Sequence, residues 1–308
     1  MMVITFYNLG FISLEKIKVV REIRKIGKEF IISKLRNYIK VIHLMYLRKK
    51  NGVLVSNVVF IPAIKISERG SSYDYSINSW KEWCNKNNCE LLVLEELLYP
   101  VDYMKITWQR YYLFDILDKN NIEYNQILMV DADTIIHPDC PNFFKESENK
   151  YCGVMNDGDY EWVLRSIKGF GEEMFGGSKI NPWNYINGGF QIVNKTHKEF
   201  FNTMREYYSD NSDWINKTIK KLKTATDQTI LNFMLNENKV DVKILPNCYN
   251  LQDLFRKNLL YIDESCWWSD ELHFLNAGWI YHFNAIPQNK MGRDANYWIR
   301  RTYKELYK

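Results

Sequence analysis

Two carboxylates one residue apart are the strongest chemical signal in the 308-residue chain. Asp131 and Asp133 flank Ala132 and directly follow four apolar residues, 127–130. In an extended backbone, residues i and i+2 point to the same side, so both carboxylates could approach one divalent cation. Mg²⁺ and Mn²⁺ take such oxygen ligands together with substrate phosphates. The pattern predicts a cation site at the end of a buried strand. The structural alternative is a pair of solvated acids that open a loop.

His282 is the third candidate ligand. It follows the apolar residues 279–281, so we expect it to end a strand. A lone histidine after an apolar run often has only a structural role, and that alternative stays open. As a ligand it would complete a three-residue metal set with Asp131 and Asp133.

Two further segments combine polar residues with a change in backbone structure. Asn187 precedes Gly188 and Gly189 at the start of an apolar run. Glycines let a backbone approach a ligand closely or adopt positive φ, although an ordinary turn explains the same residues. Asp227 and Gln228 open a predicted helix, where an N-capping side chain alone stabilises a helix by about 1 kcal/mol.

These residues lie within an alternating pattern of strands and helices. Strands are predicted over residues 53–66, 90–94 and 126–130, with helices over 74–87 and 105–119 between them. The second half is less regular, with strands over 151–155, 185–193 and 240–245 and helices over 195–209 and 226–237. A βαβαβ order predicts an α/β fold with a largely parallel, nucleotide-binding sheet, whose ligands bind beyond the carboxyl ends of the strands.

Four segments in order resemble the motifs of GT-A glycosyltransferases, especially the family 8-like retaining enzymes. They are the Asp131-Ala132-Asp133 strand end, the Asn187-Gly188-Gly189 segment with Asn194, the Asp227-Gln228 helix start with Asn232, and the Leu245-Pro246 turn with Tyr249 and Asn250. His282 is similar to the late metal-binding histidine of that family. The resemblance covers roughly residues 53–303. It implies a Rossmann-like GT-A fold with a mixed, mostly parallel sheet, and metal-dependent, retaining transfer of a hexose.

The same resemblance suggests roles for individual residues around the donor. It implies that Pro62 and Ala63 meet the nucleobase or ribose, and that Asn187 contacts donor hydroxyls from a loop with Gly188 and Gly189. It further implies a nucleotide-diphosphate sugar as the donor, with a UDP-sugar favoured, and Mn²⁺ or Mg²⁺ as the cofactor.

The catalytic candidates are Asp227, which would bind the transferred sugar, Gln228, which would lie beside the anomeric carbon, and Asp157, which could contact the sugar. A neutral amide is a poor nucleophile, so Gln228 would stabilise charge. An inverting enzyme would instead need a carboxylate base, and Asp157, Asp159 or Glu161 could serve.

Basic residues before the strand and after the histidine are candidates for contacts with the phosphates. Lys105 and Arg110 could face the donor, with surface solvation as the alternative. The family pattern places a lysine six residues after the histidine, where this chain has Gln288. Lys290 is the nearest substitute.

The N-terminal segment differs in charge from the rest of the chain. Residues 11–50 hold twelve lysines and arginines against three glutamates, whereas the whole chain carries +4. Apolar residues recur at helical spacing over 13–48, which predicts a basic amphipathic extension over 1–50 followed by a glycosyltransferase domain over 51–308. The extension could lie on an anionic membrane surface, or pack on its own domain or on a second subunit. The acidic remainder argues against nucleic-acid binding.

The six cysteines form no C-x-x-C pair and no zinc-type cluster, which favours reduced thiols and a cytoplasmic location. The basic extension allows a peripheral position at a membrane surface. No secretory signal or membrane-spanning run is expected.

Two rival functions remain. A nucleotidyltransferase usually has a glycine-rich basic loop after the first strand, but 64–70 holds one glycine. A non-catalytic sugar-binding protein of the same fold is the other. The acceptor could be a glycan, a protein or a lipid.

Overall fold

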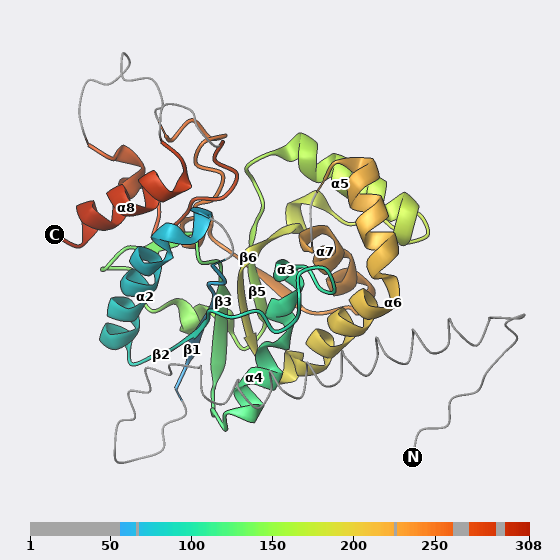
Figure 1. Cartoon of the computed structure of the whole chain (residues 1–308), viewed down its shortest axis with the longest axis horizontal. Helices are drawn as coiled ribbons and strands as arrows, with labels where there is room; N and C mark the ends of the chain where they lie inside the picture. Colours follow the sequence, from blue (N-terminus) through green and yellow to red (C-terminus); the bar gives the residue numbers. More distant parts are fainter. Residues whose placement is uncertain (1–55, 66–67, 225–226, 261–270, 288–292) are drawn as a thin grey trace, which may run out of the picture. The chain divides into compact units, whose positions relative to one another are not determined.

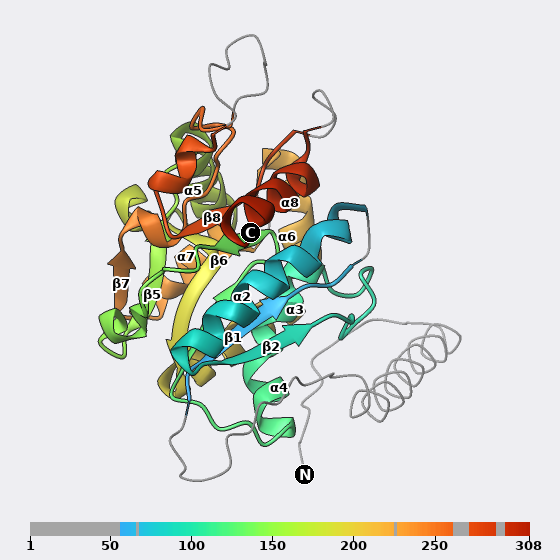
Figure 2. The same ribbon diagram turned by 90° about the vertical axis from the view of Figure 1, so that its left-hand side faces the viewer.

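Short apolar runs form the strands of one central sheet in a computed structural model, which describes residues 56–65, 68–224, 227–260, 271–287 and 293–308. The basic extension predicted over 1–50 and Lys290 lie outside these residues. The six strands have the order β2-β1-β3-β6-β5-β7 (Figure 1; β7 is labelled in Figure 2). Their bounds are Val58–Pro62 (β1), Glu90–Leu94 (β2), Gln126–Val130 (β3), Tyr151–Met155 (β5), Ile186–Asn194 (β6) and Val242–Leu245 (β7).

The sheet is mixed and mostly parallel, as predicted. β1 pairs in parallel with β2 and β3, and β5 pairs in parallel with β7. β6 runs antiparallel to both β3 and β5. This reversal brings the start of β6 beside the end of β3, where Val130 pairs with Phe190 and Asp131 N donates to Gly189 O at 3.0 Å. The single reversed strand therefore places the Asn187–Gly189 segment next to the paired aspartates.

A second, two-stranded sheet continues from the end of β3. It joins β4, Thr134–Ile136, to β8, Ile280–His282, in antiparallel register with Thr134 opposite His282. The predicted strand that ends at His282 is confirmed. This small sheet connects the middle of the chain to its C-terminal part.

The helices cover the sheet as two groups. They are α2 (Tyr73–Asn87), α3 (Ile106–Gln109), α4 (Leu113–Lys119), α5 (Tyr160–Met174), α6 (Lys198–Leu222), α7 (Gln228–Glu237) and α8 (Ala295–Leu306). α2 lies across β1 and β2 and packs with α8 (Figure 2), while α5 packs with α6 and α7. Trp80 and Trp83 of α2 are buried against Val59 and Ile61 of β1, as the alternation of strand side chains requires.

Several predicted bounds needed correction. The strand expected over 53–66 is only Val58–Pro62 among its described residues. The helix expected over 105–119 is broken by a 3₁₀ turn at Arg110–Tyr112, where the side chains of Arg110 and Tyr111 are buried. The helix expected over 195–209 begins at Lys198 and extends to Leu222, because residues 210–213 are polar helix residues that weaken the sequence signal without ending the helix.

The described cysteines, at positions 84, 89, 140, 152 and 248, are all free, and Cys266 lies outside the described residues. No helix in the described part of the chain is both long and apolar enough to cross a membrane.

Candidate active site

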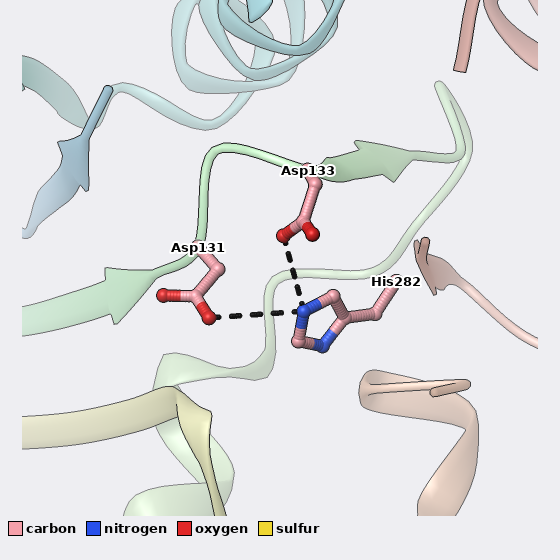
Figure 3. Close-up of side chains that lie close together, drawn as sticks. All are labelled: Asp131, Asp133 and His282. Atoms are coloured by element: carbon pink, nitrogen blue, oxygen red, sulfur yellow. Dashed lines mark ion pairs between the residues drawn. The ribbon is translucent and has the colours of Figure 1, made fainter. Parts of the chain in front are cut away.

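The paired aspartates lie in a turn, and this differs from the extended backbone that we expected. Asp131 directly follows β3 and Asp133 directly precedes β4 (Figure 3). Thr134 Oγ1 donates to Asp131 O at 2.7 Å, and Trp80 Nε1 donates to Thr134 Oγ1 at 3.0 Å. The chain must leave the six-stranded sheet here to enter the two-stranded one, which forces the turn. The two carboxylates nevertheless face one point.

The two-stranded sheet brings His282 to that point. Phe283 N donates to Asp133 O at 2.8 Å, which extends the pairing of β4 with β8 beyond Thr134. His282 Nε2 lies 3.2 Å from Asp133 Oδ1 and 3.7 Å from Asp131 Oδ2. The three potential ligand atoms all lie within 4.8 Å of one another. A single cation could contact all three.

A chain of amide hydrogen bonds sets which nitrogen of His282 carries its proton. Gly189 N can only donate, and it donates to Asn187 Oδ1 at 2.9 Å. Asn250 Nδ2 donates to the same oxygen at 3.2 Å, so Asn250 Oδ1 faces His282 Nδ1 at 3.1 Å. The amide oxygen must accept, and therefore neutral His282 has its hydrogen on Nδ1.

The remaining nitrogen of His282 then has a lone pair that faces two carboxylates. Nε2 is buried and has no hydrogen-bond donor among the described residues. A lone pair beside two negative charges is unfavourable unless a proton or a cation lies between them. One imidazole nitrogen and two carboxylate oxygens form a donor set that suits Mn²⁺ or Mg²⁺. The residues present therefore fit the predicted metal.

The pKa of His282 reflects the same arrangement. Burial acts to lower the pKa, but Asp133 and, after it, Asp131 and Asp253 raise it more, so the pKa lies above the ordinary value of 6.5. Without a cation, a proton on Nε2 would offset the two carboxylates.

Arg110 supplies the buried positive charge of the site. Its Nη2 lies 2.9 Å from Asp131 Oδ1, and its Nε lies 3.9 Å from Asp227 Oδ2, a contact too long for a hydrogen bond. Nη1 donates to Gly188 O at 2.8 Å. Arg110 is only 7% exposed, so the surface-solvation alternative is wrong for this residue. Together, Arg110, Asp131, Asp133, Asp227 and His282 are called the strand-end cluster below.

The two glycines lie inside β6, so the ordinary-turn interpretation of this segment is wrong. A Cβ atom on Gly189 would lie 2.6 Å from Asp131 Oδ2 and 2.6 Å from His282 Cε1. Close approach to the ligand atoms, rather than positive φ, therefore requires glycine here. Gly188 N donates to Gln228 Oε1 at 2.9 Å, and Asn187 Nδ2 donates to the same atom at 3.2 Å.

Asp227 and Gln228 lie where α7 begins, but Asp227 does not cap the helix with its side chain. Its Oδ2 instead accepts from Tyr111 Oη at 3.3 Å. Asn232 clamps α7 to β6, since its Oδ1 accepts from Ile186 N at 2.8 Å and its Nδ2 donates to Ile186 O at 2.9 Å. Asn232 thus holds the start of α7, with Asp227 and Gln228, beside the first residue of β6.

A cavity of about 580 Å³ collects most of the predicted site residues. This volume is in the range of small-molecule sites, roughly 300–1,000 Å³. The predicted residues that line it are Pro62, Arg110, Asp131, Ala132, Asp133, Asn187, Gly188, Gly189, Asp227, Gln228 and His282.

Three predicted residues lie elsewhere. Ala63 is buried outside the lining, and Lys105 is exposed outside it. Asp157 also lies outside the lining: its Oδ1 is 2.5 Å from Lys257 Nζ, and its Oδ2 accepts from Asn247 Nδ2 at 2.7 Å.

The structure adds residues that the sequence patterns did not indicate. Asn156, Trp162, Asp253, Arg256 and Asn284 all line the cavity. Trp162 lies in the first turn of α5 and the other four lie on connections between elements, and no recognisable spacing marks any of them. Asn250 belongs to the Leu245-Pro246 turn motif, but the sequence did not indicate its role. The structure shows that its side chain contacts the ring of His282.

The charged residues that line the cavity have a net negative charge, which a divalent cation could neutralise. Four carboxylates are opposed by two guanidinium groups and a histidine whose neutral form places a lone pair inward. The negative groups are Asp131, Asp133, Asp227 and Asp253, and the positive groups are Arg110 and Arg256. The excess of two negative charges matches one Mn²⁺ or Mg²⁺ ion.

No protein-family model and no curated protein sequence matches the chain. Among solved structures, the fold is similar to that of a glycosyltransferase involved in the glycosylation of the major capsid of PBCV-1, with a TM-score of 0.51 and 9% identity over 80% of this chain and 99% of that chain. Mouse xyloside xylosyltransferase 1 in its apo form is similar over 76% of this chain and 100% of that chain, with a TM-score of 0.41 and 12% identity. The first likeness shows that the chain has the GT-A-like fold that its motifs predict.

Proposed function

We propose that this protein is a metal-dependent glycosyltransferase that moves a sugar from a nucleotide-diphosphate donor, with a UDP-sugar favoured, onto an acceptor hydroxyl. The observation that carries this proposal is the convergence of three ligand atoms, His282 Nε2 and one carboxylate oxygen each of Asp131 and Asp133, which lie within 4.8 Å of one another just after β3. The GT-A-like fold supports it, because such a fold binds nucleotides beyond the ends of its strands.

A bound cation would offset the charge that develops on the diphosphate as it leaves. The protein's own residues would bind the rest of the donor. Pro62, Ile64 and Tyr73 line the cavity on the β1 side and offer apolar and aromatic surface to a nucleobase or ribose. Asn187 and Asp227 offer amide and carboxylate groups to the hydroxyls of the sugar.

The reaction joins the acceptor oxygen to the anomeric carbon of the sugar. The bond from that carbon to the phosphate oxygen breaks, and its electron pair leaves with the nucleoside diphosphate. The proton of the acceptor hydroxyl passes to the departing phosphate oxygen. Gln228 would orient the sugar, because its Oε1 is held by Gly188 N and Asn187 Nδ2 and a neutral amide is a poor nucleophile.

The three carboxylates that the sequence offered as the base of an inverting mechanism all have partners. Asp157 pairs with Lys257, Asp159 accepts from Trp162 N at 3.0 Å, and Glu161 pairs with Arg165 at 3.1 Å. An inverting enzyme would need a carboxylate free to take a proton from the acceptor. Their engagement supports transfer with retention of configuration.

A panel of nucleotide-sugars, screened by thermal shift with and without Mn²⁺, tests this proposal. We expect at least one UDP-sugar to raise the melting temperature only when Mn²⁺ is present, and to be hydrolysed slowly without an acceptor. A Mn²⁺-dependent shift without any turnover would favour the non-catalytic sugar-binding alternative. Formation of a sugar-nucleotide from a sugar phosphate and UTP would favour the nucleotidyltransferase instead.

A further inference from the structure

Two segments that are far apart in the sequence meet beside the cavity. Asp159 caps α5 by accepting from Trp162 N at 3.0 Å. Its Oδ2 lies 3.8 Å from Arg256 Nε, and Arg256 Nη1 donates to Asp253 Oδ1 at 2.9 Å. We call Asp159, Trp162, Asp253 and Arg256 the rim cluster. The start of α5 is thus tied to the loop that follows β7.

The backbone around the rim cluster is closely fitted. A Cβ atom on Gly158 would lie 2.0 Å from Asp253 Oδ2, so the segment before α5 packs directly on this carboxylate. Asp253 is only 2% exposed, and its φ of 52° lies in the left-handed region that non-glycine residues rarely adopt. Its N–H donates to Asn284 Oδ1 at 2.8 Å. These contacts hold the Asp253 backbone and carboxylate in place.

The order of strands places the rim cluster away from the nucleobase end of the cavity. Pro62 ends β1, Asp131 follows β3, Asn187 lies in β6, and α5 follows β5. In the sheet these strands are neighbours in the order β1-β3-β6-β5. The strand-end cluster therefore lies between the apolar β1 side and the rim cluster. A donor whose nucleobase lies on the β1 side and whose diphosphate lies at the strand-end cluster would direct its sugar toward the rim cluster.

Trp162 brings an indole ring to this end of the cavity. The residue lines the cavity and is half-buried, and its ring meets that of Tyr185 at a steep angle, with centroids 6.5 Å apart and planes at 87°. Tyr185 is itself buried, and its hydroxyl bonds to Thr229 Oγ1 at 2.7 Å. The indole is therefore supported by a residue that is fixed in the core.

Polar groups surround the indole at the same end. Arg256, Asn156 and Asp253 line the cavity with a guanidinium, an amide and a carboxylate. A pyranose has one face rich in C–H bonds, which packs on an aromatic ring, and a rim of hydroxyls, which pairs with planar polar groups. These groups already pair within the protein, Arg256 with Asp253 and Asn156 with Asn187, but a lipid chain could not use the donors and acceptors that they have left. This combination therefore favours a sugar.

We propose that the rim cluster forms the acceptor subsite and that the acceptor is a saccharide, with a pyranose ring stacked on Trp162 and its hydroxyls bound by Arg256, Asn156 and Asp253. This inference rests on the proposed glycosyltransferase function and narrows its acceptor from a glycan, a protein or a lipid to a glycan. Trp162 selects the ring that receives the donor sugar.

Saturation-transfer NMR with a panel of methyl α- and β-pyranosides (glucose, galactose, mannose, xylose and N-acetylglucosamine), with and without UDP and Mn²⁺, tests the proposal. We expect at least one pyranoside to bind. Trp162→Ala should weaken that binding at least tenfold, while Trp162→Phe, which keeps an aromatic face, should stay within about threefold. Trp214→Ala is the matched control, because Trp214 is 45% exposed on α6 and lies outside the cavity lining.

Several outcomes would overturn the proposal. They are the absence of pyranoside binding by the wild type, equal binding by Trp162→Ala, and sugar transfer to a serine or threonine peptide or to lipid vesicles with none to the saccharides. Parallel titrations of Mn²⁺ and UDP separate the two levels of inference. Intact Mn²⁺ and UDP binding without pyranoside binding would remove only the acceptor assignment. Pyranoside binding without any Mn²⁺ or UDP binding would remove the donor function instead.

Discussion

The strand-end cluster and the rim cluster each hold an arginine–aspartate pair, but in different surroundings. The side chain of Arg110 is 8% exposed and meets Asp131, Asp227 and a backbone carbonyl. The side chain of Arg256 is 40% exposed, and it pairs with Asp253 and more distantly with Asp159. A buried charge without its partner destabilises a fold strongly, whereas water compensates for an exposed one. We therefore expect the first pair to contribute more to the stability of the fold than the second.

We expect the largest effect on Mn²⁺ binding, which should depend on the strand-end cluster and not on the rim cluster. Asp133→Asn removes a charged ligand while it keeps the shape of the side chain. We expect Mn²⁺ affinity to fall by more than the roughly 10- to 100-fold typical of residues that only support a ligand, and turnover to be lost. Electron paramagnetic resonance of free Mn²⁺ measures the affinity. Asp159→Asn in the rim cluster is the control and should bind Mn²⁺ normally. Equal Mn²⁺ affinity in Asp133→Asn and wild type would contradict the site.

The two arginines should differ in their contribution to stability. Arg110→Ala leaves Asp131 and Asp227 without their shared partner, so we expect the free energy of unfolding to fall by about 3–5 kcal/mol. Arg256→Ala should lower it less, because the side chain of Arg256 is 40% exposed and water can take its place beside the buried carboxylate of Asp253. Urea denaturation of both variants in EDTA gives the comparison. If the two losses were equal, burial would not be what distinguishes the clusters.

Asn250 and Asn247 lie in one short turn, but their side chains contact different parts of the structure. Asn250 accepts from His282 Nδ1, whereas Asn247 donates to Asp157. Asn250→Ala removes the acceptor that fixes the His282 tautomer, and we expect Mn²⁺ affinity to fall about 10- to 100-fold. Asn247→Ala should leave it unchanged. Comparable losses in the two variants would show that the turn as a whole, rather than the tautomer, matters.

The smallest effect is a dependence of stability on pH in the metal-free protein. The pKa of His282 is raised above 6.5 in the folded state, despite burial, by Asp133 and Asp131. Its proton therefore stabilises the fold fully below about pH 6.5, and this stabilisation is lost as the pH rises through the folded pKa. One proton changes the free energy of unfolding by at most about 1.4 kcal/mol per pH unit.

Urea denaturation between pH 6 and 8, in EDTA and in saturating Mn²⁺, measures this dependence. Mn²⁺ replaces the proton on folded His282, so stability in Mn²⁺ should rise as the pH passes through the unfolded pKa of about 6.5, whereas in EDTA it should fall above that pH. His282→Gln should remove both trends. A rise in EDTA as well would mean that His282 is not protonated between the carboxylates.

Local patterns predicted much of the fold because they depend on neighbouring residues. The strands at 90–94, 126–130 and 151–155 have the predicted bounds, and α2 begins one residue before the predicted helix. These segments have continuous apolar runs or clear helical spacing, which packing did not override. α6 was predicted too short because its polar residues 210–213 gave no signal, although the buried Ile215 and Thr218 continue the helix.

The sequence by itself determined which residue types would form the site: two acids after a buried strand, an asparagine with two glycines, an aspartate with a glutamine at a helix start, and a late histidine. Only the tertiary structure decided that the acids lie in a turn, that a backbone N–H sets the His282 tautomer through two asparagines, and that Arg110 is buried between two aspartates. The rim cluster also exists only through the tertiary structure, because Asp159 and Arg256 are almost a hundred residues apart in the sequence. Contacts of this range depend on how strands are ordered and paired, and no local spacing in the sequence records that order.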